Sequence, residues 1–304
     1  MKTKMRKASL IIAVIALLSS CSGANNNIVC YTRDTTSGTR DGFFTGIGFS
    51  EAKEDNSKLG ENFVEVASNG DMISAIKNDV NGIGYISLST LEDSGVKGLN
   101  YEGVVPSEEN VLNNTYKLTR NFNYCVREEY TNQDSRDIVS AFIGYMSSIE
   151  GKSTIETNGG ILPSSSDDKS WSELSLTYPI CNKDNQNTTI YVGGSTSVKT
   201  IVNALLTEFS SKCGGFKYSY NPTGSADAYK RTNGSEKDGT NYCDLAFASR
   251  EFNESEPLLD NLKGKMCIDA IVAVVNNQNT ISDVTASQLK SIYDGTIKTW
   301  DQVF

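Results

Sequence analysis

Hydrophobic positions along the chain fall into two patterns, short β-branched runs and longer stretches with helical spacing. The clearest helical stretch is 197–212, where apolar residues recur every three or four positions, the spacing of one buried face. The same spacing predicts helices over 71–79, 137–149 and 285–293. Thr285 and Gln288 form a capping box that marks the start of the last of these. Short apolar runs predict strands over 83–88, 122–127, 216–220, 243–247 and 268–275.

Two segments share the order of strand, small polar turn and further apolar segment. Thr189–Val192 leads through Gly193–Ser197 into the helix at 197–212, and Ile28–Tyr31 leads into the turn at 33–40. Strands that alternate with helices predict an α/β architecture with largely parallel sheets. The polar stretch 162–188 contains two prolines and is predicted to be a linker or long surface connection between two blocks of sequence.

The first twenty residues have the pattern of a targeting segment. Four basic residues precede an apolar stretch from Ala8 to Leu18, and Leu18-Ser-Ser-Cys21 follows. This is similar to a bacterial lipoprotein signal, so we expect a signal peptide over 1–20, a lipid on Cys21 and a tether over 21–27. No later apolar run approaches the ~18 residues of a membrane span. The chain is therefore expected outside the cytoplasm, anchored to the cell membrane by lipid, at the cell surface or in the periplasm.

Composition excludes several classes of function. The chain has no histidine, which removes the Ser-His-Asp triad, the Cys-His pair and the commonest zinc ligand. It has 28 Lys and Arg against 37 Asp and Glu, and a net charge of −9, so nucleic acid is not an expected partner. Its 304 residues are enough for two compact domains.

Six cysteines follow Cys21, and none of them has C-x-x-C spacing. We therefore expect no metal cluster. Export permits disulfides, but the sequence selects no pairing, and buried free thiols are an equal alternative. The six are Cys30, Cys125, Cys181, Cys213, Cys243 and Cys267.

Small hydroxylated residues recur in the turns that follow predicted strands. Such turns occur at 35–39, 194–197, 222–225 and 248–250. At the start of a helix the first N–H groups lack partners and the dipole is positive, so such turns can surround a tetrahedral anion with donors. Any one of them could equally be an ordinary N-cap. Arg33 and Arg250 stand beside two of them, and an arginine fork suits phosphate or carboxylate oxygens, which favours a ligand site.

The chain resembles the phosphate-binding lipoproteins that serve phosphate ABC importers. Arg33-Asp-Thr-Thr-Ser-Gly-Thr-Arg-Asp-Gly-Phe43 is similar to the R-x-x-x-S-G-T-R-x-x-F signature of that family, and Asn81-Gly-Ile-Gly-Tyr-Ile-Ser-Leu88 to a later strand. Further similarity lies at 191–198, 244–250 and 289–300. In the family, the motif corresponding to 191–198 comes first. The order here is therefore that of a circular permutation.

This resemblance implies an α/β, two-lobed periplasmic-binding-protein-like (type II) fold with a hinge. One lobe would comprise 116–276, within which 162–188 joins the usual ends of the family, and the other would comprise 28–115 plus 277–304. The crossovers near 115 and 277 would be the hinges. Phosphate would lie in the cleft between the lobes, with closure excluding water.

The resemblance also implies a binding function without catalysis or cofactor. The expected phosphate ligands are Arg33, Ser37, Gly38, Thr39, Ser195, Thr196, Gly224, Ser225, Ser249 and Arg250. The expected protein is a monomer that delivers inorganic phosphate to an ABC permease. Some family members carry an Asp where Arg250 stands, and that acceptor of the phosphate proton is missing here. Asp34 and Asp227 are the candidates to replace it.

Three other readings have support in the sequence. Another tetrahedral oxyanion could be the ligand, or the fold could serve a surface lipoprotein that acts as an adhesin. A Ser-Lys hydrolase is suggested by two S-x-x-K matches, Ser74 with Lys77 and Ser287 with Lys290. No S-D-N or K-T-G motif accompanies them, and both pairs fall on the expected wet faces of helices.

Overall fold

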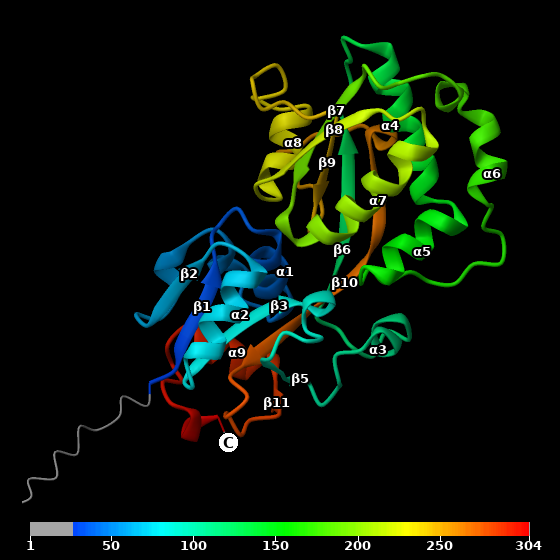
Figure 1. Ribbon diagram of the computed structural model, residues 1–304. Helices are drawn as coiled ribbons and strands as arrows, with labels where there is room; N and C mark the ends of the chain where they lie inside the picture. The colour runs from blue at the N-terminus through cyan, green and yellow to red at the C-terminus, as the bar shows by residue number, and fades with distance from the viewer. Residues whose placement is uncertain (1–26, 304) are drawn as a thin grey trace, which may run out of the picture.

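A computed structural model describes residues 27–303, so the predicted signal peptide, Cys21 and most of the tether lie outside the described residues. Figure 1 shows two lobes joined by long strands that run between them. We call them the terminal lobe, whose core is built from residues 28–118 and 268–303 together with Ile161, and the middle lobe, whose core is built from the rest of 122–267. Among the described helices, none is both long and apolar enough to cross a membrane.

The terminal lobe contains both described ends of the chain. A bridge between Asn27 and Thr299 places these ends side by side. Its strands are β1 (Val29–Arg33), β2 (Phe63–Val66), β3 (Gly82–Ser87), β4 (Lys97–Gly98), β5 (Asn100–Tyr101) and β11 (Asp283–Val284). Its helices are α1 (Gly38–Gly46), α2 (Asn69–Asn78), α3 (Glu108–Leu112) and α9 (Ala286–Tyr293).

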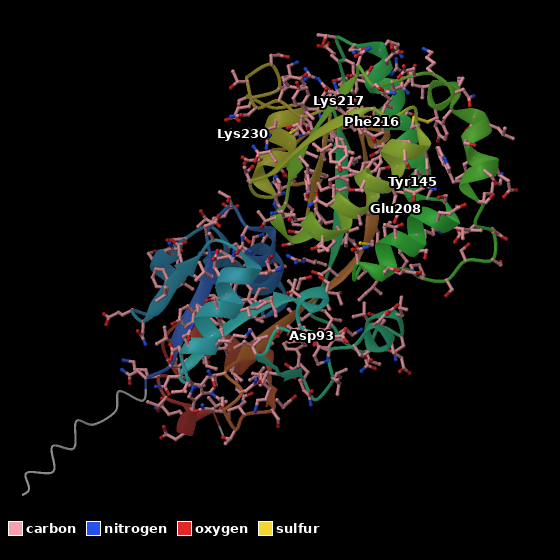
Figure 2. All side chains as sticks on the ribbon, in the orientation of Figure 1. Asp93, Tyr145, Glu208, Phe216, Lys217 and Lys230 are labelled. Carbon is pink, nitrogen blue, oxygen red and sulfur yellow. A yellow bond between two sulfur atoms is a disulfide. The ribbon has the colours of Figure 1, made fainter. Side chains whose placement is uncertain are left out.

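The middle lobe repeats the alternation of strand and helix. Its strands are β6 (Thr119–Val126), β7 (Thr189–Gly194), β8 (Lys217–Pro222), β9 (Leu245–Ala248) and the first part of β10 (Lys263–Val275). Its helices are α4 (Gln133–Met146), α5 (Ile149–Thr157), α6 (Trp171–Leu174), α7 (Lys199–Lys212) and α8 (Ala226–Thr232). Figure 2 shows Tyr145 and Glu208 on facing helices α4 and α7, where the Tyr145 hydroxyl donates to Glu208 at 2.7 Å.

One curled sheet runs through both lobes in the order β2-β1-β3-β10-β6-β9-β7-β8, with β4 added to β10. Within the lobes β1 is parallel to β2 and β3, and β7 is parallel to β8 and β9. The pairs that involve β6 and β10 are antiparallel. The mixed α/β fold is thus confirmed. The prediction of parallel pairing holds for β1, β2 and β3 and for β7, β8 and β9, but β6 and β10 pair antiparallel inside both lobes as well as with each other.

The two crossings between the lobes lie within strands β6 and β10. Leu118 packs in the terminal core and Phe122 in the middle core, close to the predicted crossing near 115. The second crossing falls between Cys267 and Ile268 rather than near 277. The predicted boundary is displaced because β10 is one 13-residue strand, whose last residues pair with β3 of the terminal lobe.

The predicted linker at 162–188 is a packed part of the middle lobe. It contains α6 and two short 3₁₀ turns, and its Trp171 is buried against Tyr145 and Phe209. Cys181 at its end forms a disulfide with Cys213 at the end of α7. Its polar composition predicts a surface position, but spaced apolar residues such as Trp171 and Ile180 secure the segment to the core.

An aromatic cluster in the terminal lobe holds the end of β1 in place. Phe43 of α1 stacks on Tyr85 of β3 with ring centroids 4.1 Å apart, and both contact Tyr293 of α9. The Tyr85 hydroxyl accepts from the backbone N–H of Arg33 at 3.0 Å. These three rings are fully buried, so they fix where the chain leaves β1 and enters the turn before α1.

The four other described cysteines are buried free thiols. Burial raises the pKa of Cys30 and of Cys125 to about 12, and that of Cys243 to about 11. Because the thiolate is the reactive form, these groups stay protonated and inert near neutral pH.

We therefore predict that iodoacetamide at pH 8 leaves Cys30, Cys125, Cys243 and Cys267 unmodified in the folded protein and modifies all four after unfolding in urea. Peptide mapping by mass spectrometry distinguishes each site. Rapid alkylation of any of the four in the folded protein would contradict their burial.

Candidate functional site

The four hydroxylated turns meet where the lobes touch. Ser37 caps α1, its Oγ accepting from the N–H groups of Thr39 and Arg40 at 3.2 and 3.4 Å. From this first turn, the hydroxyl of Thr39 contacts that of Ser197 in the middle lobe at 2.8 Å. The site therefore contains residues of both lobes.

Three buried serines form the wall opposite α1. Ser195 follows β7, Ser225 precedes α8 and Ser249 follows β9. The hydroxyl of Ser249 lies 2.9 Å from that of Ser195 and 3.0 Å from that of Ser225, and its N–H donates to Ser225 Oγ at 2.9 Å. All three sit near the carboxyl ends of parallel strands, which is where open α/β sheets bind their ligands. We call these residues the serine cluster.

Two glycines let the chains approach this closely. A Cβ atom at Gly38 would lie 2.3 Å from Ser249 Oγ and 2.5 Å from Ser225 Oγ. Gly194 has a φ of +95°, and a Cβ there would lie 2.0 Å from the carbonyl oxygen of Phe247. Only glycine fits the second position, because the backbone of β9 is too rigid to move aside.

Arg33, at the end of β1, points into the contact between the lobes and is only 3% exposed. Its Nε donates to Val66 O at 3.1 Å, and its Nη2 donates to Ala67 O at 2.7 Å and to Thr196 Oγ1 at 3.3 Å. Its Nη1 is buried without an acceptor.

The charge of Arg33 is also unmatched. Asp34 and Asp71 are near enough to influence it, but no carboxylate in the described part of the chain forms an ion pair with it. Burial lowers the pKa of Arg33, but arginine starts so high that it remains a cation. A buried cation with an unused donor is costly unless an anion completes it.

Arg120 and Asp269 form a second charged group that the sequence analysis did not include. The Arg120 side chain donates from Nε and Nη2 to one Asp269 oxygen at 2.9 and 2.7 Å. The other oxygen accepts from Ser87. Burial raises the pKa of Asp269, and the charge of Arg120 opposes this shift. An ionisable residue inside the apolar run 266–275 was the signal that could have revealed it.

The guanidinium of Arg250 forms no hydrogen bond with the serine cluster. Both of its terminal nitrogens donate to Glu256, at 2.6 and 2.8 Å. It lines a cavity of about 370 Å³ at the mouth of the contact between the lobes, together with Ser37 and Asn253. Its guanidinium is therefore held by a carboxylate of its own lobe, although its neighbour Ser249 is part of the cluster.

The candidate acceptor aspartates are held by their own turns. Asp34 accepts from the N–H of Thr36 at 2.9 Å and from its hydroxyl, and Asp227 accepts from the hydroxyl of Thr223. Gly224 lies in the turn between β8 and α8, and a Cβ atom there would stand 3.1 Å from Thr36 Oγ1. Because both carboxylates are engaged, the acceptors that the serine cluster offers to a ligand are hydroxyl groups. A hydroxyl group can both donate and accept a hydrogen bond.

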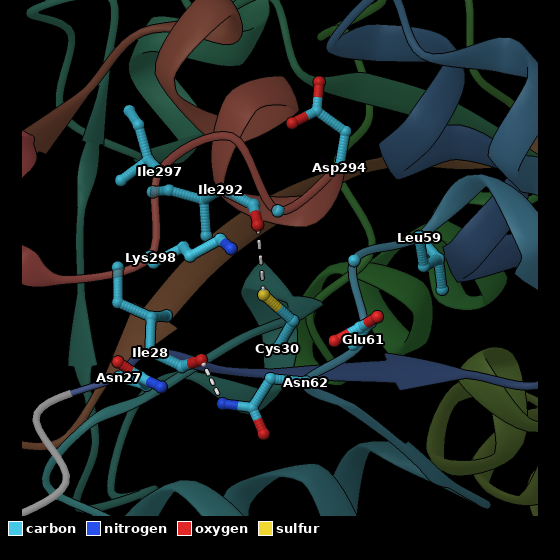
Figure 3. A pocket seen from close by; sticks show the side chains of 12 residues that line it. Asn27, Ile28, Cys30, Leu59, Glu61, Asn62, Ile292, Asp294, Ile297 and Lys298 are labelled. Atoms are coloured by element: carbon cyan, nitrogen blue, oxygen red, sulfur yellow. Dashed lines mark hydrogen bonds between the residues drawn. The ribbon is translucent and has the colours of Figure 1, made fainter.

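Other features of the terminal lobe are separate from this site. Figure 3 shows a pocket of about 420 Å³ where Cys30 Sγ donates to Ile292 O at 3.4 Å and Asn62 donates to Ile28 O at 2.6 Å. None of the hydroxylated turns lines it. Among residues 27–303 no group of Cys, Asp and Glu side chains is arranged to hold a metal ion.

The two lobes and the strands that cross between them are the arrangement of the periplasmic-binding-protein-like fold. Residues 182–304 match the PBP superfamily domain. Phosphate-binding protein PstS 2 of Streptococcus pneumoniae is 28% identical over 295 residues, which cover 94% of this chain and 90% of that protein. PstS 2 of Streptococcus agalactiae is 24% identical, with 95% and 94% covered.

A solved structure agrees with these relatives. The crystal structure of a phosphate-binding protein of a phosphate ABC transporter from Streptococcus pneumoniae matches with a TM-score of 0.67 and 25% identity, over 91% of this chain and all of that one. The resemblance drawn from the motifs is thus confirmed: the chain is related over nearly its whole length to the phosphate-binding proteins of ABC transporters. These relatives are named as binding proteins and not as enzymes.

We predict that Gly38→Ala lowers the free energy of unfolding by about 1–3 kcal/mol, because the added methyl group must displace Ser225 and Ser249. Urea denaturation followed by tyrosine and tryptophan fluorescence measures the change. The matched control is Gly70→Ala on α2, where a Cβ atom meets only Ser68 Oγ at 3.6 Å. Equal midpoints for the two variants would show that Gly38 is not confined.

Proposed function

We propose that this protein captures inorganic phosphate between its lobes and delivers it to the permease of an ABC importer. The observation that carries the proposal is the buried guanidinium of Arg33, which has no ion-pair partner among the described residues and stands beside the serine cluster. A tetrahedral oxyanion supplies the missing negative charge. The names of the relatives agree with this choice of ligand.

The same residues describe how the anion is held. Ser37, Gly38 and Thr39 offer donors at the N-terminus of α1, where the helix dipole favours negative charge. Ser195, Thr196, Gly224, Ser225 and Ser249 complete the shell from the middle lobe. The hydroxyls of the serine cluster bond to one another, so binding exchanges serine-to-serine bonds for bonds to a charged acceptor, which are stronger.

Selectivity among oxyanions depends on the acceptor for the phosphate proton. Asp34 and Asp227 are already engaged, and Arg250 occupies the place where some family members carry an Asp. A serine hydroxyl then accepts this proton, and such a group also donates to a fully ionised anion. Sulfate therefore competes with phosphate here, and another tetrahedral oxyanion is the second candidate ligand. If the folded protein binds none of these oxyanions, the alternative of a surface lipoprotein that acts as an adhesin is favoured instead.

The order of the motifs supports a circular permutation of the family order given in the sequence analysis, and the PstS 2 relatives, which align over 94–95% of this chain, share the order found here. The segment at 33–43 precedes that at 191–198, and the described ends adjoin through Asn27 and Thr299. A chain reopened within 162–188 and joined across these ends keeps every contact of the site. We expect it to fold and to bind phosphate within about threefold of the natural order, as judged by calorimetry. Failure of binding in a folded, reordered chain would count against the permutation.

The proposed cellular location is inferred from the N-terminal sequence and from the relatives. Cys21 carries the lipid that holds the protein at the outer face of the membrane, and the monomer meets the permease there. This part of the proposal rests on the N-terminal pattern, which lies outside residues 27–303.

For the site itself, we predict that Arg33→Ala weakens phosphate binding by about 2–5 kcal/mol, because it removes a buried charged partner of the anion. Isothermal titration with phosphate, sulfate and molybdate measures both affinity and selectivity. Arg250→Ala is the matched control, since its guanidinium is paired with Glu256, and it should change affinity by less than about 1 kcal/mol. If titration of phosphate into the wild-type protein gives no binding heat, the proposed function is wrong.

A further inference from the structure

Arg120 has the same unusual feature as Arg33, a buried N–H that nothing accepts. It is 7% exposed, and its Nε and Nη2 are fully used by Asp269, while its Nη1 has no partner. Asp269, whose other oxygen accepts from Ser87, binds the guanidinium along its Nε–Nη2 edge, so Nη1 faces away from this carboxylate. An orphaned donor on a buried charged group is costly, and structures rarely keep one without a use.

The position of Arg120 on β6 brings it beside the helix whose N-terminus meets the serine cluster. A Cβ atom at Gly42 would lie 3.4 Å from Cδ of Arg120. Gly42 is four residues after Gly38, so both lie on one face of α1. Gly38 meets Ser225 and Ser249 on this face, and Gly42 leaves room for the Arg120 stem one turn further on.

The two arginines also influence each other. The positive charge of Arg120 acts on Arg33, with which it shares the space between the lobes. Arg33 and Arg120 together bring two positive charges, and among the described side chains only Asp269 pairs with either of them. One positive charge therefore remains buried and unmatched, next to two unused N–H groups.

We propose that Arg120 is a second arginine that contacts the bound oxyanion, donating from Nη1 alongside Nη1 of Arg33. This inference rests on the proposed function and adds to it a ligand contact from a strand that crosses between the lobes. Asp269 orients the guanidinium and compensates one charge, which leaves a net charge suited to an anion.

The test is isothermal titration of phosphate into the wild-type protein and into Arg120→Gln and Arg120→Lys. We expect about a 10- to 100-fold loss of affinity in Arg120→Gln, the size of one charge-assisted hydrogen bond. Arg120→Lys keeps the charge but loses the fork, so it should fall between Arg120→Gln and wild type. Arg136→Gln, on the exposed face of α4, is the control and should bind like wild type.

The outcomes separate this inference from the proposed function. If the wild-type protein binds phosphate and Arg33→Ala does not, but Arg120→Gln binds within twofold of wild type, the contact from Arg120 is wrong and the function stands. Loss of binding in the wild type overturns both. If the Arg120 variants fail to fold, a crystal structure of the wild-type protein with phosphate decides. A ligand oxygen about 3 Å from Arg120 Nη1 supports the contact, and an Nη1 bonded only to protein overturns it.

Discussion

The structure is organised around positive charge buried where two lobes touch. Arg33 and Arg120 are nearly inaccessible to solvent, and each retains an N–H without an acceptor. Among the described carboxylates only Asp269 pairs with either of them, and it pairs with Arg120. A protein pays several kcal/mol to bury a charge of this kind, so it persists only where something else completes it. We propose that an anion bound between the lobes completes it.

Several otherwise unrelated features serve this arrangement. The stacked rings of Phe43 and Tyr85 fix the end of β1 and with it the base of Arg33. Arg40, a fully buried neighbour from the same motif, donates to the carbonyl oxygens of Arg33 and Ala52 and so braces the turn rather than facing the ligand. Asp269, on the other crossing strand, orients Arg120. These supports lie in the terminal lobe, whereas the serine cluster lies in the middle lobe. We therefore propose that occupancy of the site and contact between the lobes are coupled.

Local patterns predicted most of the secondary structure. The helix at 197–212 forms as one 3₁₀ turn followed by α7, and Thr285 and Gln288 form the capping box that their spacing predicts. Both depend on neighbours three or four residues apart, which the sequence displays directly. The segment 162–188 shows the limit of this reasoning. Its polarity predicts a linker, whereas Trp171 and Ile180 bind it to a core that only distant residues create.

The sequence alone determined which chemistry this protein could use. It excluded imidazole, and its hydroxylated turns and their motifs identified an oxyanion as the class of ligand. The tertiary structure decided which of those residues face one another. It turned Arg250 toward Glu256, and it brought Arg120 of β6 and Asp269 of β10 together beside the site. Pairings across 149 residues of chain depend on strand register and on burial from every side, and no local pattern of side chains encodes either.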